Sequence, residues 1–313
     1  MSYNIAPSPN RHRKKRTHYS SAFIVGMAFL AFFVIGLTVS FSIRACSRHR
    51  NFSREEIQYT EPSTEPVEAR YEELKGLSIP YEMPDSVVWI CLPNPLEGIA
   101  EQIIHKSSYI VSYNKATKLP NWVAWNLTAD QTDGPARRIS NFYEEESVAC
   151  PRATLEDYRG SCWSRGHMCP AGDNKWSEAA MYDSFSLINV CPQDANLNSG
   201  LWNRIEMDCR KWAKKFGSVY IVCGPLFYNK EHETIGVNNV VVPEAFFKVI
   251  LCLQGKPKAI GFVVKNNAGT KKKDQYVNTV DDVERLTGYD FFPALPDSIE
   301  EKVEAYANIE DWR

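Results

Sequence analysis

The feature that most constrains the fold of this chain is a series of short apolar runs rich in β-branched and aromatic residues. They occupy residues 108–114, 121–127, 185–190, 218–224, 245–253 and 259–265, and Asn, Gly or Pro bounds them. Such runs are typical of β-strands. Helical patterns are fewer and do not alternate strictly with the strands, so we predict an α+β fold rather than a doubly wound parallel sheet.

Three segments have helical periodicity, residues 176–185, 197–217 and 279–288. The longest of them, 197–217, carries one apolar stripe and stops at a glycine. The last begins with a capping-box pattern, Thr279 followed three residues later by Asp282, and ends at Gly288. We therefore expect helices over these three segments.

A separate constraint is the uncharged apolar run over residues 19–43, which has 25 residues. A helix of about 20 apolar residues spans a bilayer, and the preceding RHRKKR predicts a cytoplasmic N-terminus. A cleaved signal peptide is the alternative, but it usually ends at a small-residue cleavage site, and we find none. We predict a single-pass membrane protein with a cytoplasmic tail over 1–18 and a transmembrane signal anchor over 19–43. The remainder would lie in the periplasm or outside the cell.

Charge separates the N-terminal region from the rest. Residues 1–50 contain eight Lys and Arg and no acid, whereas the whole chain has a net charge of −2, so residues 51–313 carry −10. Residues 44–85, rich in Glu, Pro and Thr, predict a solvated stalk. Residues 86–300 predict a globular domain, and 301–313 a C-terminal tail. An acidic body is no general polyanion binder, so any nucleic-acid function must rest on a local basic site.

The cysteines fit an oxidising compartment. Cys46 lies next to the predicted membrane span, and eight others fall in the globular part: Cys91, Cys150, Cys162, Cys169, Cys191, Cys209, Cys223 and Cys252. An even number there predicts disulfides, although the sequence does not choose among the pairings. The absence of a C-x-x-C pair argues against a structural zinc site.

The long helical segment contains a carboxylate in its apolar stripe. Glu206 lies between Trp202 and Cys209, where an unpaired carboxylate is costly to bury. Asn198 lies two turns earlier, and the two side chains are about 80° apart around the helix. An amide oxygen and a carboxylate so placed can hold a hard divalent cation together with waters. The alternative is that Asn198 caps the helix and Glu206 pairs with a nearby arginine.

A histidine stands in the constrained stretch SCWSRGHMCP. Arg165 and His167 alternate across Gly166, so in an extended backbone their side chains point to the same face. A guanidinium beside a neutral imidazole suits phosphate chemistry, since the first neutralises phosphoryl oxygens while the second takes a proton from water. A metal ligand and a satisfied core histidine are the alternatives.

The order of these blocks is specific: SRGHM, then NVCPQDANLNSGLWNRIE, then IVCGPLFY. In this order the chain resembles the DNA/RNA non-specific endonucleases of the ββα-metal (His-Me finger) type, the endonuclease G-like group. The resemblance covers roughly residues 108–293. It implies a central, mostly antiparallel sheet flanked by helices, forming an endonuclease domain over 86–300. The predicted transmembrane helix would precede this fold.

The resemblance also implies roles for residues by position. His167 falls on the general base that activates the attacking water, and Arg165 on an arginine that stabilises the charged transition state. Asn198 falls on the only direct protein ligand of a Mg²⁺ ion, for which Mn²⁺ is a substitute. Glu206 falls on a glutamate that organises the metal-bound waters.

Two further residues receive roles from the resemblance. Asn189 belongs to an N-x-x-P-Q block and is expected to orient the histidine or the nearby backbone. Arg138 is the best candidate for a second phosphate-contacting arginine, with Arg137 beside it. The resemblance implies DNA and RNA substrates without sequence specificity, products with a 5′-phosphate, and a homodimer.

Ser164 departs from the family pattern, which begins Asp-Arg-Gly-His. Serine brings no charge, so the pKa of the histidine or the pose of the arginine would change. Cys162, Cys169 and Cys191 are expected to brace this loop by disulfides. Three functions stay open: a metal-dependent nuclease, a catalytically reduced nucleic-acid-binding ectodomain, and a narrower phosphodiesterase acting on small diesters.

Overall fold

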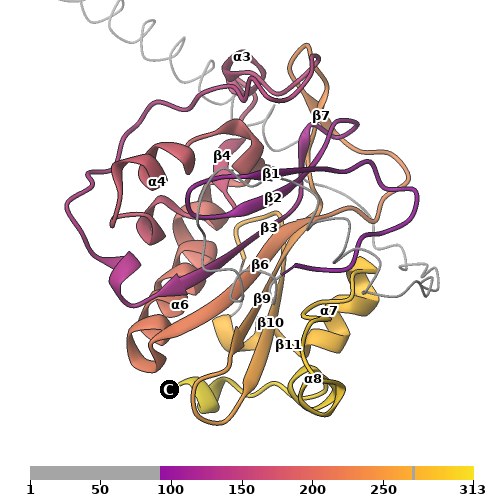
Figure 1. The fold of residues 1–313 in the computed structure, drawn as a ribbon. Helices are drawn as coiled ribbons and strands as arrows, with labels where there is room; N and C mark the ends of the chain where they lie inside the picture. The colour runs from indigo at the N-terminus through magenta and orange to yellow at the C-terminus, as the bar shows by residue number, and fades with distance from the viewer. Residues whose placement is uncertain (1–91, 270–271) are drawn as a thin grey trace, which may run out of the picture. The chain divides into compact units, whose positions relative to one another are not determined.

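The computed structural model describes residues 92–269 and 272–313 of the chain (Figure 1). Its centre is a seven-stranded antiparallel sheet with the order β1-β2-β3-β6-β9-β10-β11. The strands of this sheet are β1 (Gln102–His105), β2 (Ile110–Asn114), β3 (Leu119–Thr128), β6 (Ser218–Leu226), β9 (Ala245–Cys252), β10 (Lys258–Lys265) and β11 (Val277–Asn278). Two short antiparallel pairs lie outside it: β4 (Ser164–His167) with β5 (Val190–Gln193), and β7 (Thr234–Ile235) with β8 (Val240–Val241).

Short helices and turns connect and cover the strands. The α-helices are α3 (Leu155–Tyr158), α4 (Glu178–Asp183), α5 (Ala195–Leu197), α6 (Asn203–Phe216), α7 (Val280–Thr287) and α8 (Asp297–Glu304). The 3₁₀ turns are η2 (Asp130–Thr132), η3 (Ala171–Asp173), η4 (Leu187–Asn189), η6 (Lys273–Tyr276) and η7 (Ile309–Trp312), and η5 (Asn198–Trp202) is a π-helical turn.

The sheet separates two hydrophobic cores. Because neighbouring strand residues point to opposite faces, Val123 and Trp125 enter one core while Trp122 and Ala124 enter the other. Helix α6 covers the first core through residues such as Ile205. Helices α7 and α8 cover the second, so the two sets of helices lie on opposite faces of the sheet (Figure 1).

Most predicted elements are confirmed. The strand patterns over 108–114, 121–127, 218–224, 245–253 and 259–265 coincide with β2, β3, β6, β9 and β10, and the three helical patterns with α4, the α5–η5–α6 segment and α7. The capping box of α7 is formed, since Thr279 Oγ1 accepts a hydrogen bond from the Asp282 N–H at 3.0 Å. The strand predicted over 185–190 is wrong, because the chain there forms η4 and β5 begins only at Val190.

The predicted transmembrane helix is not found in the described structure. No helix within residues 92–269 and 272–313 is long and apolar enough to cross a bilayer. The longest of them, α6, has 14 residues and carries acidic and basic side chains, against the roughly 20 apolar residues that a span requires. The anchor predicted over 19–43, the tail over 1–18 and the stalk over 44–85 lie outside the described residues.

Candidate active site

The SRGH stretch forms strand β4, which pairs with β5 and leads on to the α5–η5–α6 helical segment. Ser164 lies opposite Gln193, and Gly166 lies opposite Cys191. Gly166 is required by this pairing, because a Cβ at that position would lie 2.3 Å from Gln193 Oε1. His167, Asn198 and Glu206 thus belong to one structural motif, in which two antiparallel strands are followed by a helix.

His167 is 7% exposed and held by two aromatic rings. The centroids of Phe142 and Phe185 lie 5.1 Å and 5.0 Å from that of the imidazole. Its Nε2 atom is buried and has no hydrogen-bond partner. Burial, together with the positive charges of Arg138 and Arg165, lowers the pKa of His167 to about 3. The imidazole is therefore neutral at neutral pH.

The two arginines stack on the rings that hold the histidine. The guanidinium carbon of Arg165 lies 4.5 Å from the centroid of Phe142, and that of Arg138 lies 5.2 Å from the centroid of Phe185. Both side chains belong to exposed residues. Cation–π contacts of this kind fix a guanidinium while leaving its N–H groups free for an anion.

Asn189 holds the backbone that follows the histidine. Its Oδ1 accepts a hydrogen bond from the Cys169 N–H at 2.8 Å, and its Nδ2 donates to the Cys169 carbonyl at 2.8 Å and to the Ser184 carbonyl at 2.9 Å. The Met168 N–H donates to the Asn189 carbonyl at 2.9 Å. This buried side chain therefore fixes the turn after His167 rather than the imidazole itself.

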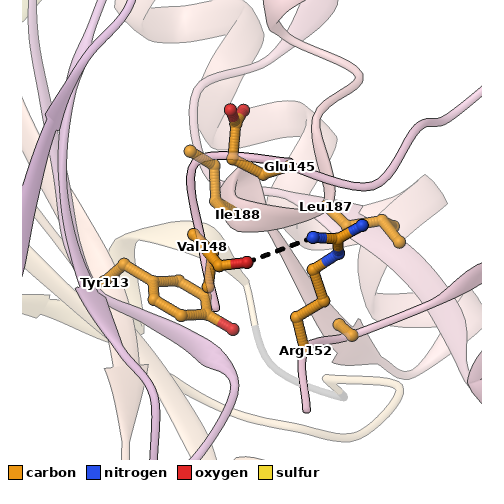
Figure 2. A pocket seen from close by; sticks show the side chains of 7 residues that line it. Tyr113, Glu145, Val148, Arg152, Leu187 and Ile188 are labelled. Atoms are coloured by element: carbon orange, nitrogen blue, oxygen red, sulfur yellow. Dashed lines mark hydrogen bonds between the residues drawn. The ribbon is translucent and has the colours of Figure 1, made fainter. Parts of the chain in front are cut away.

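A polar network holds the turn η4, which contains Asn189. Glu145 accepts hydrogen bonds from Ser186 Oγ at 2.9 Å and pairs with Lys106 at 2.6 Å. Burial raises the pKa of Glu145, but hydrogen bonds from Lys106, Ser147 and Ser186 outweigh it and hold the pKa below its usual value. Figure 2 shows Glu145 among the residues that line a small cavity, where Arg152 donates to the Val148 carbonyl at 3.1 Å. The network fixes the start of η4, whose last residue is Asn189.

Asn198 opens the π-helical turn η5 between α5 and α6. It does not cap the helix, because Asp194 does: its carboxylate accepts from the N–H groups of Asn196 and Leu197 at 2.9 Å and 3.1 Å. Within residues 92–269 and 272–313 the side chain of Asn198 makes no hydrogen bond, so its amide oxygen is available to a ligand. Single π turns of this kind are frequent at functional sites.

Glu206 lies on α6, and the charges of Asp173, Arg210 and Lys248 act on its carboxylate. Burial raises the pKa of Glu206 to about 7, although Lys248, Arg210 and Arg138 act in the opposite direction. The alternative, a pairing of Glu206 with an arginine, is not formed among the described residues, and Arg210 Nη1 bonds to Asp173 Oδ1 at 2.7 Å. A partly buried carboxylate without an arginine partner is suited to binding a cation or its waters.

Asp173, Arg210 and Lys248 were not identified from the sequence. Asp173 also accepts a hydrogen bond from Trp125 Nε1 at 3.2 Å. Lys248 is 1% exposed, and its Nζ lies 4.9 Å and 4.7 Å from the ring centroids of Trp125 and Trp202. Two features of the sequence could have indicated Arg210 and Lys248. Arg210 lies one turn after Glu206, and Lys248 is the only charged residue in the apolar run 245–253.

The structure brings His167, Arg165 and Arg138 together around the rings of Phe142 and Phe185. The positive charge of Arg138 lowers the pKa of both His167 and Glu206. Arg165 contacts the Phe142 ring, whereas Asn189 lies in the supporting turn. Arg137 is exposed and enters none of the contacts of the histidine.

Of the three cysteines expected to brace this loop, Cys162 is disulfide-bonded, whereas Cys169 and Cys191 form no disulfide. Both are buried free thiols, as are Cys209, Cys223 and Cys252. Hydrogen bonds made by Asn189 and the strand pair β4–β5 also hold the loop.

Comparison with known proteins supports the resemblance. A family model for DNA/RNA non-specific endonucleases matches residues 93–298. The mouse protein "Nuclease EXOG, mitochondrial" is 38% identical over 234 residues, which cover 69% of this chain and 63% of that protein. Human "Endonuclease G, mitochondrial" is 35% identical over 215 residues, covering 64% of this chain and 72% of that protein. The chain therefore spans less than two thirds of the length of its mouse relative.

The fold is similar to a solved structure, that of the EndoG/EndoGI complex, with a TM-score of 0.63 and 27% identity. The match covers 68% of this chain and 92% of that chain.

These relatives contradict the predicted localisation. The mouse and human proteins are named as mitochondrial, whereas the apolar run and basic flank predicted a single-pass membrane protein with its catalytic domain in the periplasm or outside the cell. A run of apolar residues after a basic segment does not by itself distinguish a membrane anchor from other N-terminal segments. We therefore do not retain that prediction.

The family match extends over most of the chain, from before β1 into α8. It includes the strand pair that carries His167, the helical segment that carries Asn198 and Glu206, and all seven strands of the central sheet. This chain belongs to the DNA/RNA non-specific endonuclease family.

Proposed function

We propose that this chain is a metal-dependent endonuclease that hydrolyses phosphodiester bonds of DNA and RNA without sequence specificity. The observation that carries the proposal is the environment of His167. Its Nε2 atom is buried without a hydrogen-bond partner, and two guanidinium groups stack on the rings that hold it. A neutral imidazole with an unpartnered nitrogen beside two cations is suited to a general base acting next to a phosphate.

In this proposal His167 takes a proton from the water that attacks phosphorus. Before substrate binds, the low pKa of His167 in the folded chain keeps the imidazole unprotonated at neutral pH. The negative charge of a bound phosphate then favours the imidazolium that forms. The turn fixed by Asn189 keeps the imidazole in position during this transfer. Arg165 and Arg138 neutralise the non-bridging oxygens as negative charge develops on them.

The donor set fits a hard divalent cation. Asn198 offers an amide oxygen that makes no hydrogen bond among the described residues, and Glu206 offers a partly buried carboxylate. We propose that Asn198 binds Mg²⁺ directly and that Glu206 holds its waters, with Mn²⁺ as a substitute. The ion would neutralise charge on the phosphoryl group and on the leaving 3′-oxygen.

These residues account for the lack of sequence preference. The charged groups of the site are suited to the phosphodiester backbone, and phosphate contacts carry no direct sequence information. Attack of water on phosphorus with departure of the 3′-oxygen leaves a 5′-phosphate on the product. A homodimer is a further prediction of the resemblance, which light scattering of the purified chain would check.

The decisive experiment measures cleavage of supercoiled plasmid and of single-stranded RNA by the full chain. Mg²⁺, EDTA, His167→Ala and the control His105→Ala would be compared, because His105 lies exposed on the edge strand β1. We expect both substrates to be cut with Mg²⁺, no cleavage in EDTA, and a loss of about 10³-fold or more in the His167 variant only.

Other outcomes would contradict the proposal in distinguishable ways. Cleavage of a small phosphodiester but not of nucleic acid would indicate the narrower phosphodiesterase. Nucleic-acid binding without cleavage, even with Mn²⁺, would indicate a binding module, and Ser164→Asp would then be the substitution to test for restored activity.

A further inference from the structure

A second group of carboxylates lies on the face of the sheet opposite α6. Asp281 and Glu284 lie one turn apart on α7, and Glu304 is the last residue of the neighbouring helix α8. One carboxylate oxygen from each of the three lies within 4.8 Å of the others. None of the three residues is exposed.

Glu304 gives this cluster its unusual character. The residue is 6% exposed, and its Oε1 atom is buried without any hydrogen-bond partner. It also stands at the C-terminus of α8, where the helix dipole disfavours a negative charge. A buried carboxylate in this position requires a proton or a cation as its partner.

The carboxylates around Glu304 strengthen its need for a proton or a cation as a partner. Burial, together with the negative charges of Glu284, Glu300, Asp290 and Asp281, raises its pKa to about 9. Glu284 is affected in the same way, with a pKa raised to about 7 by burial and by neighbouring carboxylates against a hydrogen bond from the Phe291 N–H. The nearest base on α7, Arg285, pairs with Asp282 instead.

We propose that Asp281, Glu284 and Glu304 form a structural binding site for a divalent cation of the Ca²⁺ type. Calcium binds oxygen at about 2.3–2.6 Å, so two oxygens on opposite sides of one ion lie about 4.8 Å apart. Three oxygens within that distance of one another fit a single calcium ion, with waters completing its shell. Mg²⁺ usually keeps several of its waters and is bound through one or two carboxylates, so a site with three carboxylates favours Ca²⁺.

The bound ion joins two helices that cover the second core. Val280 and Val283 of α7 and Val303 of α8 are buried in that core. An ion shared by Asp281, Glu284 and Glu304 therefore ties both helices to the same face of the sheet. The site is separate from Asn198 and Glu206, which belong to the α5–α6 segment on the other face.

The test is thermal unfolding of the full chain in EDTA and in CaCl₂. The wild type is compared with Glu304→Gln and with the matched control Glu301→Gln, an exposed residue of the same helix. With calcium a hundredfold above its dissociation constant, we expect Tm to rise by about 5–10 °C in the wild type and the control. We expect less than about 1 °C in Glu304→Gln.

Two further arms make the result decisive. In EDTA at pH 8, Glu304→Gln should melt at or above the wild-type temperature, because the variant no longer has to take up a proton on Glu304 when the chain folds. A melting temperature in that range also shows that the variant folds. The calcium shift should persist in Asn198→Ala, which excludes the catalytic site as its source. The proposal is overturned if Tm does not respond to calcium, if Glu304→Gln shows the wild-type shift, or if Asn198→Ala abolishes the shift.

Discussion

At the scale of single residues, the site depends on how closely β4 approaches β5. Gly166 leaves no room for a Cβ, which would lie 2.3 Å from Gln193 Oε1 and 2.6 Å from Gln193 Cβ. We predict that Gly166→Ala displaces the strand carrying His167 and lowers the free energy of unfolding by about 1–3 kcal/mol. Chemical denaturation of the purified variant measures this loss.

The matched control for this substitution is a second change at Gln193. Both amide atoms of that side chain are buried without hydrogen-bond partners, so shortening it removes no hydrogen bond. The double variant Gly166→Ala/Gln193→Ala should recover part of the stability lost in Gly166→Ala. Simple additivity of the two losses would show that the clash with the amide end of Gln193 is not the cause, since Gln193→Ala keeps the Cβ atom at this position.

His167 makes stability depend on pH. Its pKa is about 3 in the folded chain and about 6.5 in an unfolded one. As the pH falls below about 6.5, the unfolded state binds a proton that the folded state rejects, so stability is lost on acidification. This residue alone should lower the free energy of unfolding by about 2 kcal/mol between pH 7 and pH 5.

Replacing the imidazole tests that assignment. His167→Gln should have a flatter dependence of unfolding free energy on pH over the same interval, whatever its stability at pH 7. Urea denaturation at several pH values gives the two curves. Parallel curves for wild type and variant would show that other groups cause the acid loss.

Part of this residue-level chemistry was accessible from the sequence. Alternation along an extended strand put Arg165 and His167 on one face, and family resemblance gave Asn198 and Glu206 their roles. The ion pair of Arg210 with Asp173 was not accessible, because it joins residues 37 positions apart through the tertiary fold. The aromatic rings of Phe142 and Phe185 around His167 were missed for the same reason.

At the scale of elements, strand β9 carries a buried cation into the first core. Burial lowers the pKa of Lys248, but the thiols of Cys223 and Cys209 and the carboxylates of Glu206 and Asp173 outweigh this effect and raise it. Lys248→Met leaves both carboxylates without this cation. We predict a loss of about 3–5 kcal/mol in the free energy of unfolding.

The control is the same substitution on the neighbouring strand β10. Lys258 is partly exposed, with its Nζ 3.8 Å from the centroid of Phe216. Lys258→Met should change stability by no more than about 1 kcal/mol. Losses of equal size in both variants, measured by chemical denaturation, would contradict a special role for the buried charge.

Elements with strong local signals were predictable, and one without them was not. The capping box of Thr279 and the positive φ of 77° at Gly288 bound α7 as expected. Residues 185–190 have the apolar composition of a strand, and Leu187 and Ile188 are buried as strand residues would be. The chain turns there instead, because Asn189 and Ser186 direct their side chains into hydrogen bonds with Cys169 and Glu145, which no local pattern reveals.

At the scale of the whole molecule, the sheet was predictable in content but not in order. Strand β3 pairs with β6 so that Val123 lies opposite Cys223, across a segment that includes β4, β5 and α6. That segment is the one that carries the candidate active site. Local propensity cannot encode a pairing of this range, because it depends on which strand faces fit together in the core. The family resemblance, not periodicity, supplied the topology.

The two faces of the sheet should therefore act independently. Glu304→Gln removes a ligand of the proposed calcium site and touches no residue of the candidate active site, so we predict plasmid cleavage with Mg²⁺ within about twofold of wild type, measured well below the Tm of both proteins. Asn198→Ala should lose about 10²-fold or more of that activity. It should nevertheless keep the calcium-induced rise in Tm. Measuring both quantities on both variants gives a double dissociation, because one site governs chemistry and the other governs the docking of α7 and α8. A loss of cleavage in Glu304→Gln as large as that in Asn198→Ala would show instead that the sheet couples its two faces.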